Sequence, residues 1–128
     1  MTTLGKSHVL SVKILMDISF IRLGYGFFWR GGSGKNALVF DAADFDTPCK
    51  FIRYVELEPY ASIGNHPHGA NEEVYIVLSG SGVMIVNGES QAVKTGDVIL
   101  NKPGWQHGLE NTSEEPLKLL VFEVDQVR

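Results

Sequence analysis

Two histidines one residue apart precede a pair of glutamates in the segment GNHPHGANEEVYIVLSG, residues 64–80. Side chains alternate between the two faces of a β-strand, so His66 and His68 would point the same way, with Cα atoms about 6.5–7 Å apart. Glu73 opens a strand-like run with Tyr75 on the same face, and a neighbouring antiparallel strand would bring the Glu73 carboxylate opposite the histidines. A shared metal ion explains this grouping better than packing does, because buried His and Glu are costly unless paired or coordinated.

A second segment, GDVILNKPGWQHGLEN at 96–111, runs from a Gly-Asp turn through an apolar strand and a Pro-Gly pair to a third histidine. Together the two segments resemble the motifs of the cupin superfamily, G-x5-H-x-H-x(3,4)-E-x6-G and G-x5-P-x-G-x2-H-x3-N. Tyr60 stands where the family has its leading glycine, and Lys102 where it has proline, with Pro103 one place later. These departures fall in turns. The matching positions are His66, His68, Glu73, Gly80, Gly96, Gly104, His107 and Asn111.

The resemblance extends over about residues 51–124 and implies an all-β fold, a double-stranded β-helix or jelly-roll barrel. It also implies that His66, His68, Glu73 and His107 bind a divalent transition-metal ion inside the barrel. Three imidazoles and one carboxylate suit Mn, Fe, Co, Ni, Cu or Zn better than Ca or Mg, which prefer oxygen ligands. The alternative is that the three histidines are hydrogen-bonded structural residues in a barrel that contains no metal.

Four protein ligands would leave two positions of an octahedral ion open to a bidentate oxygen ligand, or to water and a substrate. We therefore expect a metal-dependent protein that acts on a small oxygenated metabolite such as a carboxylate, a sugar or an enediol. By resemblance, the related activities are those of oxalate decarboxylases, isomerases and dioxygenases, but a shared fold does not fix the reaction. No motif places a general acid apart from Glu73. A non-catalytic module that binds or senses a small molecule is the alternative.

Three further side chains are candidates for the wall of a substrate pocket. Tyr75 shares the face of Glu73, where it either lines the cavity or packs in the core. Arg53 could reach inward to hold an anionic substrate, although an outward, solvated position is the expected one. Trp105, in the turn before His107, could form the rim of the pocket or be an exposed turn residue.

Short apolar runs separated by turn residues predict strands along the rest of the chain, and helix signals are nearly absent. Asn87-Gly88 is the strongest hairpin signal, because both residues tolerate the positive φ of a type I′ turn. Residues 36–128 are expected to form the barrel. The predicted strands cover 37–40, 51–57, 62–68, 73–78, 82–86, 89–93, 97–100, 106–110 and 117–124.

Residues 1–35 are expected to form an N-terminal β extension and a glycine-rich connector, with strands at 8–15 and 18–28. Such an extension could pair with the sheet edge of a second copy, so we expect a homodimer. Lys13, Asp17 and Arg22 interrupt the apolar residues here, which argues against a membrane span or a signal peptide. Met16 is an alternative start to Met1.

The composition of the 128 residues, 44% hydrophobic and 20% charged, is that of a soluble one-domain globular protein. The net charge is −4 and the basic residues are scattered, so we expect no nucleic-acid partner. Cys49 is the single cysteine, which fits a reducing compartment and a cytoplasmic location. The expected partner is therefore a small-molecule ligand or substrate.

Overall fold

The computed structural model of the chain describes residues 9–11 and 34–126. These residues form β-strands and one short 3-10 helix, η1 (Ala42–Asp44), so the all-β prediction is confirmed. The strands are β1 (Val9–Ser11), β2 (Gly34–Asp41), β3 (Cys49–Leu57), β4 (Ser62–Pro67), β5 (Asn71–Ser79), β6 (Ser81–Val86), β7 (Glu89–Lys94), β8 (Asp97–Asn101), β9 (Gln106–Glu110) and β10 (Leu117–Asp125).

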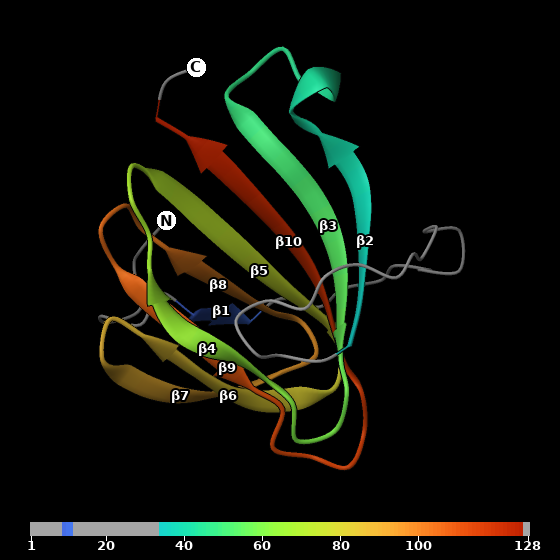
Figure 1. Cartoon of the computed structure of the whole chain (residues 1–128). Coiled ribbons are helices and arrows are strands. Elements are labelled where there is room, and N and C mark those ends of the chain that lie inside the picture. The colour runs from blue at the N-terminus through green and yellow to red at the C-terminus, as the bar shows by residue number, and fades with distance from the viewer. Residues whose placement is uncertain (1–8, 12–33, 127–128) are drawn as a thin grey trace.

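The strands form two antiparallel sheets that face each other (Figure 1). The larger sheet has the order β1-β8-β5-β10-β3-β2, and the smaller one has the order β4-β9-β6-β7. Each sheet buries one face, as the alternating burial along β6, β8 and β10 indicates. The inward faces of both sheets therefore share one interior.

The interior is apolar at one end and polar at the other. The register of β10 with β5 sets Leu119 beside Val77, and Glu123 beside Glu73. Because the strands are antiparallel, polar residues near the start of β5 meet polar residues near the end of β10. The apolar core is formed by side chains of both sheets, with Val55, Ala61 and Trp105 packed against it: Phe51, Leu57, Ile63, Tyr75, Val77, Met84, Val86, Val93, Ile99, Leu109, Leu117, Leu119 and Val121.

Tight turns set the register of the smaller sheet. Asn87 and Gly88 have φ values of 49° and 86° between β6 and β7, which confirms the predicted hairpin with both central residues in the left-handed region. Tyr60, at the position of the missing motif glycine, also has a positive φ of 62°. This conformation disfavours residues with a Cβ atom, which gives a physical reason for glycine at that position in the motif.

One expectation about strand pairing is wrong. β4 and β5 do not form an antiparallel pair, because β4 pairs with β9 in the smaller sheet while β5 pairs with β8 and β10 in the larger one. Residues 68–70 instead carry the chain from one sheet to the other. Glu73 therefore faces the histidines across the interior rather than along a ladder.

Most of the predicted N-terminal extension, including the strand at 18–28 and His8, lies outside the described residues. β1 falls inside the strand predicted at 8–15, and it pairs with β8 of the same chain, Leu10 opposite Val98. Cys49 is buried at the start of β3. Within the described part of the chain, no helix has the length and apolar character needed to cross a membrane.

Asn111, the last residue of the second motif, joins three chain segments at the apolar end of the interior. Its Nδ2 lies 3.2 Å from the Leu57 carbonyl oxygen, 3.1 Å from that of Glu58 and 2.8 Å from that of Glu115. Its Oδ1 accepts a hydrogen bond from the Ser113 backbone N–H at 3.0 Å. The side chain is fully buried. It therefore ties the backbone after β3 to the loop that precedes β10.

Replacing Asn111 with Asp is expected to lower the free energy of unfolding by more than about 3 kcal/mol, because a carboxylate would face carbonyl oxygens and donate nothing. Asn111→Ala should cost about 2–3 kcal/mol for the same lost hydrogen bonds. Asn65→Ala, at an exposed asparagine, is the control and should change stability by less than about 0.5 kcal/mol. Urea unfolding measures all three, and equal midpoints for Asn111→Asp and Asn65→Ala would contradict this role.

Candidate metal centre

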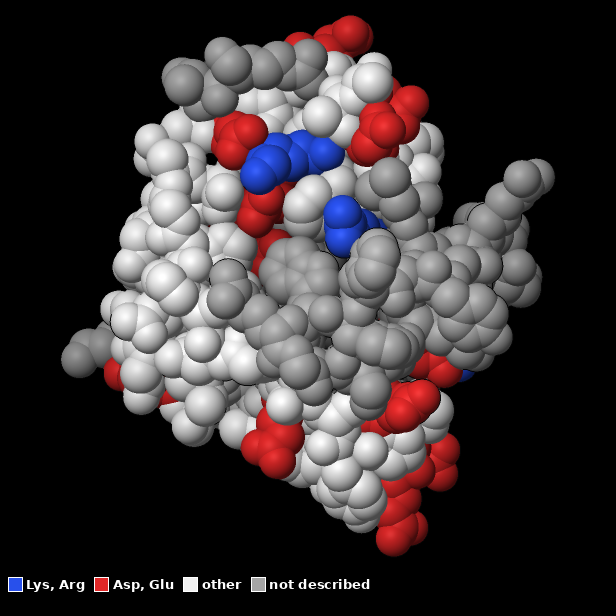
Figure 2. All heavy atoms as spheres, viewed as in Figure 1, with Lys and Arg blue, Asp and Glu red and all other residues white. Residues whose placement is uncertain are grey.

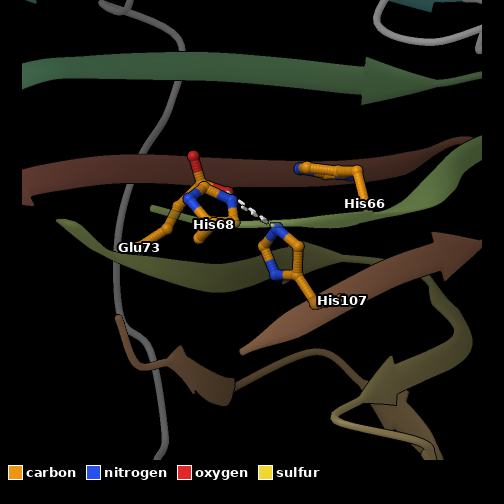
Figure 3. Close-up of side chains that lie close together, drawn as sticks. All are labelled: His66, His68, Glu73 and His107. Atoms are coloured by element: carbon orange, nitrogen blue, oxygen red, sulfur yellow. Dashed lines mark hydrogen bonds and ion pairs between the residues drawn. The ribbon is translucent and has the colours of Figure 1, made fainter. Parts of the chain in front are cut away.

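Four polar side chains from both sheets meet at the polar end of the interior: His66, His68, Glu73 and His107 (Figure 3). His66 on β4 is the register partner of His107 on β9, which sets these two rings side by side with centroids 4.7 Å apart. His68 directly follows β4, and its backbone N–H donates to the Trp105 carbonyl oxygen at 2.8 Å. All four side chains are buried, and one ligand atom from each lies within 4.8 Å of the others. The structure therefore brings together the four residues expected from the motifs.

Three of the ligand atoms have the spacing of a coordination sphere. Glu73 Oε1 lies 2.9 Å from His107 Nε2 and 3.2 Å from His68 Nε2, and the two Nε2 atoms are 3.0 Å apart. Neighbouring ligands of an octahedral ion, with metal–ligand distances near 2.1 Å, are separated by about 3.0 Å. The cluster could thus hold an ion with these three atoms on one face of an octahedron.

Hydrogen bonds to the second ring nitrogen fix two of the imidazoles. His66 Nδ1 lies 2.7 Å from the Gly64 carbonyl oxygen, which accepts a hydrogen bond from it. His68 Nδ1 lies 2.7 Å from Asn71 Oδ1 and 3.4 Å from a carboxylate oxygen of Glu123. An imidazole that donates through Nδ1 presents Nε2 as the ligand atom, so both rings are oriented for metal binding.

Without a metal, the cluster holds a proton in place of the ion. The hydrogen bond with Glu123, followed by that with Glu73, raises the pKa of His68 to about 10. Burial would raise the pKa of Glu73, but its hydrogen bonds with His107 and His68 lower that pKa to about 2. Burial lowers the pKa of His66. The metal-free protein therefore contains a buried imidazolium–carboxylate contact at neutral pH.

Glu123 is a second buried carboxylate beside the cluster, and it belongs to neither sequence motif. It is the register partner of Glu73, and it forms a 3.0 Å ion pair with Lys50. The same contact raises the pKa of Lys50. The sequence contained a signal, because Glu123 continues the inward alternation of Leu119 and Val121. On the face shown in Figure 2, basic side chains of the described residues lie next to acidic ones.

The three pocket candidates lie on or near the inward faces. Tyr75 is buried, its ring centroid is 5.0 Å from that of His107, and burial followed by the Glu73 charge raises the pKa of its hydroxyl. Arg53 pairs in register with Val121, an inward residue, and its Cζ lies 4.7 Å from the centroid of the Phe51 ring. This position differs from the outward, solvated one expected. Trp105 is partly buried and packs against the core, so it is more than an exposed turn residue.

A family model of the cupin domain matches residues 53–123, more than half of the chain. The chain belongs to the cupin family. This cupin is 32% identical over 94 residues to the oxalate-binding protein of Thermotoga maritima, over 72% of this chain and 78% of that protein. Both motifs, at residues 60–80 and 96–111, lie within the range that the family model matches.

Solved structures agree with this family. A Thermotoga maritima protein described as a predicted oxalate decarboxylase superposes with a TM-score of 0.77 at 27% identity, over 88% of this chain and 99% of that one. The cupin domain of Cnp3 from Schizosaccharomyces pombe gives a TM-score of 0.70 at 17% identity, over 86% of this chain and 72% of that one. The second likeness shows the shared fold alone.

Proposed function

We propose that this cupin binds a divalent transition-metal ion through His66, His68, Glu73 and His107, and that the ion binds a small organic acid. The observation that carries the proposal is the spacing of 2.9–3.2 Å among three buried ligand atoms from Glu73, His68 and His107. The donor set favours Mn, Fe, Co, Ni, Cu or Zn. The relative named as an oxalate-binding protein supports a carboxylate as the ligand.

The protein's own residues would orient and shield this site. A bound transition metal supplies a Lewis acid toward carboxylate, sugar or enediol oxygens. The Gly64 carbonyl and Asn71 hold the rings of His66 and His68 through their Nδ1 atoms. Tyr75 packs against the His107 ring and keeps water from that side. The ligand atoms are therefore held in place before an ion or an acid arrives.

Catalysis is a second candidate function, and Glu123 is the observation that favours it. Turnover of a small acid needs a group near the metal that can hold or move a proton. Glu123 is a buried carboxylate that faces this interior and is not part of the proposed ligand set. Metal-loaded protein that converts an added acid such as oxalate, with conversion lost in Glu123→Gln, would support an enzyme. Binding without conversion would support the non-catalytic module.

Metal binding is tested directly by purification without added metal, elemental analysis and thermal unfolding. We expect about one transition-metal ion per chain, and a lower Tm after chelation that recovers when Mn, Fe, Co, Ni or Zn is added back. His66→Gln should reduce the metal content, because the glutamine amide cannot replace a neutral imidazole as a ligand. Protein that contains no metal, and whose Tm no added metal changes, would show that the histidines are structural.

We also propose a homodimer in which the N-terminal residues cover a sheet edge. The larger sheet ends at β1 and β2, and the smaller one ends at β4 and β7, so the described barrel has edge strands available for pairing. Light scattering at micromolar concentration should give twice the mass of the 14.1 kDa chain. A monomer mass at that concentration would contradict the dimer.

A further inference from the structure

A β-bulge in β4 lies directly before the first histidine of the metal cluster. Ile63 and His66 pair with β9 residues that are two positions apart, whereas they themselves are three positions apart. Gly64 and Asn65, which we call the β4 bulge, therefore oppose the single residue Gly108. A bulge of this kind bends its strand and changes the direction in which a side chain points.

The extra residue of the bulge decides which way His66 faces. Ile63 belongs to the apolar core and His66 to the metal cluster, so both side chains face the interior. Side chains alternate along a regular strand, so two residues three positions apart would face opposite sides. Without the bulge, a strand that kept Ile63 in the core would turn His66 toward solvent.

The bulge also sets the position of the proton on the His66 ring. His66 Nδ1 donates a hydrogen bond over 2.7 Å to the carbonyl oxygen of Gly64, a bulge residue. A carbonyl oxygen only accepts, so the proton of the neutral ring is on Nδ1 and the lone pair is on Nε2. The β4 bulge therefore supplies both the inward direction of His66 and the tautomer that presents Nε2 to a metal ion.

Gly108 is the residue of β9 against which the bulge packs. It is buried, and a Cβ atom at this position would lie 2.9 Å from both the backbone N and the Cα of Asn65. The same atom would lie 3.1 Å from the Ile63 carbonyl oxygen. All three neighbours are backbone atoms, which cannot rotate away as the end of a flexible side chain can. Glycine is the residue that allows two backbones to approach this closely.

We propose that Gly108 is a positioning residue for the metal centre, because its missing side chain leaves room for the bulge that aims His66 at the ion. This inference rests on the proposed metal-dependent function and adds a residue that does not touch the ion. Gly108 directly follows His107, which is itself a proposed ligand. The effect of Gly108 nevertheless passes through His66, by way of the β4 bulge, and not through His107.

Nuclear magnetic resonance of metal-free protein labelled with ¹⁵N-histidine tests this geometry without any ion. At pH 8, where an ordinary imidazole is neutral, long-range ¹H–¹⁵N spectra identify the protonated nitrogen of each ring. Wild-type His66 should have its proton on Nδ1, the less common form in solution. Gly108→Ala displaces the bulge, so His66 should lose this preference. A His66 tautomer that is the same in both proteins would overturn the inference.

Titration with Ni²⁺ tests the effect on the metal centre through a double-mutant cycle. We expect Gly108→Ala to weaken Ni²⁺ binding by about 10- to 100-fold, as is usual when a ligand loses its support. In the His66→Gln background the same substitution should change the affinity by less than about twofold, because the residue it positions is already lost. Equal losses in the two backgrounds would show that Gly108 acts through another ligand and would overturn the inference.

Two other glycine-to-alanine changes separate positioning from packing. Gly69 directly follows His68, and a Cβ atom there would have nothing within 4 Å apart from its chain neighbours, so Gly69→Ala should change neither the Tm nor the affinity. Gly82 lies in the same sheet as Gly108, and its Cβ would collide with the Glu110 carbonyl oxygen. Gly82→Ala should therefore lower the Tm but leave Ni²⁺ binding unchanged, because β6 meets the cluster at its other end.

The metal function and this inference fail in different ways. Wild-type protein that binds no Ni²⁺ would overturn the metal function, and the role of Gly108 in metal binding with it. Wild-type protein that binds Ni²⁺, with equal losses of affinity in Gly108→Ala and Gly82→Ala, would overturn the inference alone.

Deletion of Asn65 provides the test if Gly108→Ala does not fold, because it removes the bulge without adding an atom. His66 should then face outward, and the Ni²⁺ affinity should fall at least to that of His66→Gln. Wild-type affinity in the deletion variant would overturn the inference.

Discussion

Metal affinity is expected to rise about tenfold for each pH unit between pH 6.5 and 8.5, and the rise should not level off in this range. The reason is the proton on His68, whose pKa the Glu123 and Glu73 contacts raise to about 10. A metal ion must displace this proton, and at every pH below 10 most of the metal-free molecules contain it. Each rise of one pH unit lowers the proton concentration tenfold, so protons compete ten times less strongly with the metal ion for His68.

An imidazole with an ordinary pKa of about 6.5 would behave differently, because the affinity would level off above about pH 7.5. Titration with Ni²⁺ in two buffers of different ionisation enthalpy counts the protons released. We expect close to one proton at pH 8, against almost none for an unperturbed histidine. A plateau above pH 7.5 together with no proton release would show that His68 is neutral before the metal binds.

Glu123→Gln provides the matched control, because it removes the first cause of the raised pKa and keeps a similar volume. His68 would then lose its proton at a lower pH, so the metal affinity should level off at a lower pH than in wild type. The same variant removes the partner of Lys50, which lies at the surface end of the pair with its side chain 41% exposed. Proton release at pH 8 should fall, while the ligand set itself is unchanged.

The fold could be predicted from the sequence because its signals are local. Alternating burial requires only the period of two along a strand, and the Asn87-Gly88 turn follows from the φ values those residues accept. The motif spacings also identified the four residues of the cluster. The alternation and the turn each lie within one short segment, and the four residues of the cluster come from the two motif segments at 60–80 and 96–111.

The partner of each strand could not be predicted in the same way. Alternation indicates that Glu73 faces inward, but it does not say whether β5 lies beside β4 or across the interior from it, and the structure shows the second arrangement. Asn101 and Arg53 were missed or misjudged for a related reason. A polar residue on an inward face is normally unfavourable, so alternation alone does not lead one to expect such residues there. The polar cluster that makes this interior hospitable to them is assembled from both sheets, and no single segment of the sequence contains it.

Replacing Glu73 with Gln is expected to have the largest effect on the metal-free protein. The Glu73 side chain is fully shielded from solvent, and its Oε1 lies 2.9 Å from His107 Nε2 and 3.2 Å from His68 Nε2. Removing one partner of a buried ion pair leaves the other charge uncompensated and costs about 3–5 kcal/mol. The variant should also lose its bound metal, because an amide oxygen is a weaker ligand than a carboxylate.

The pH dependence distinguishes this ionic contribution from a simple packing defect. The low pKa of Glu73 adds stability above its unfolded value of about 4.5, and this is lost as the pH falls toward 2. The raised pKa of His68 adds stability below about 6.5, and this is lost as the pH rises toward 10. The difference between wild type and Glu73→Gln, measured by urea unfolding, should therefore be greatest near pH 5.5 and should shrink in both directions.

Glu72→Gln is the matched control on the same strand. Glu72 is only partly buried and lies next to Val124 rather than Glu123, so its replacement should change the free energy of unfolding by less than about 0.5 kcal/mol. A packing defect at residue 73 would give a loss that does not vary with pH. A loss of stability that peaks near pH 5.5, together with the loss of metal, would show that the Glu73 carboxylate pairs with protonated His68 in the metal-free protein and binds the ion in the metal-loaded protein.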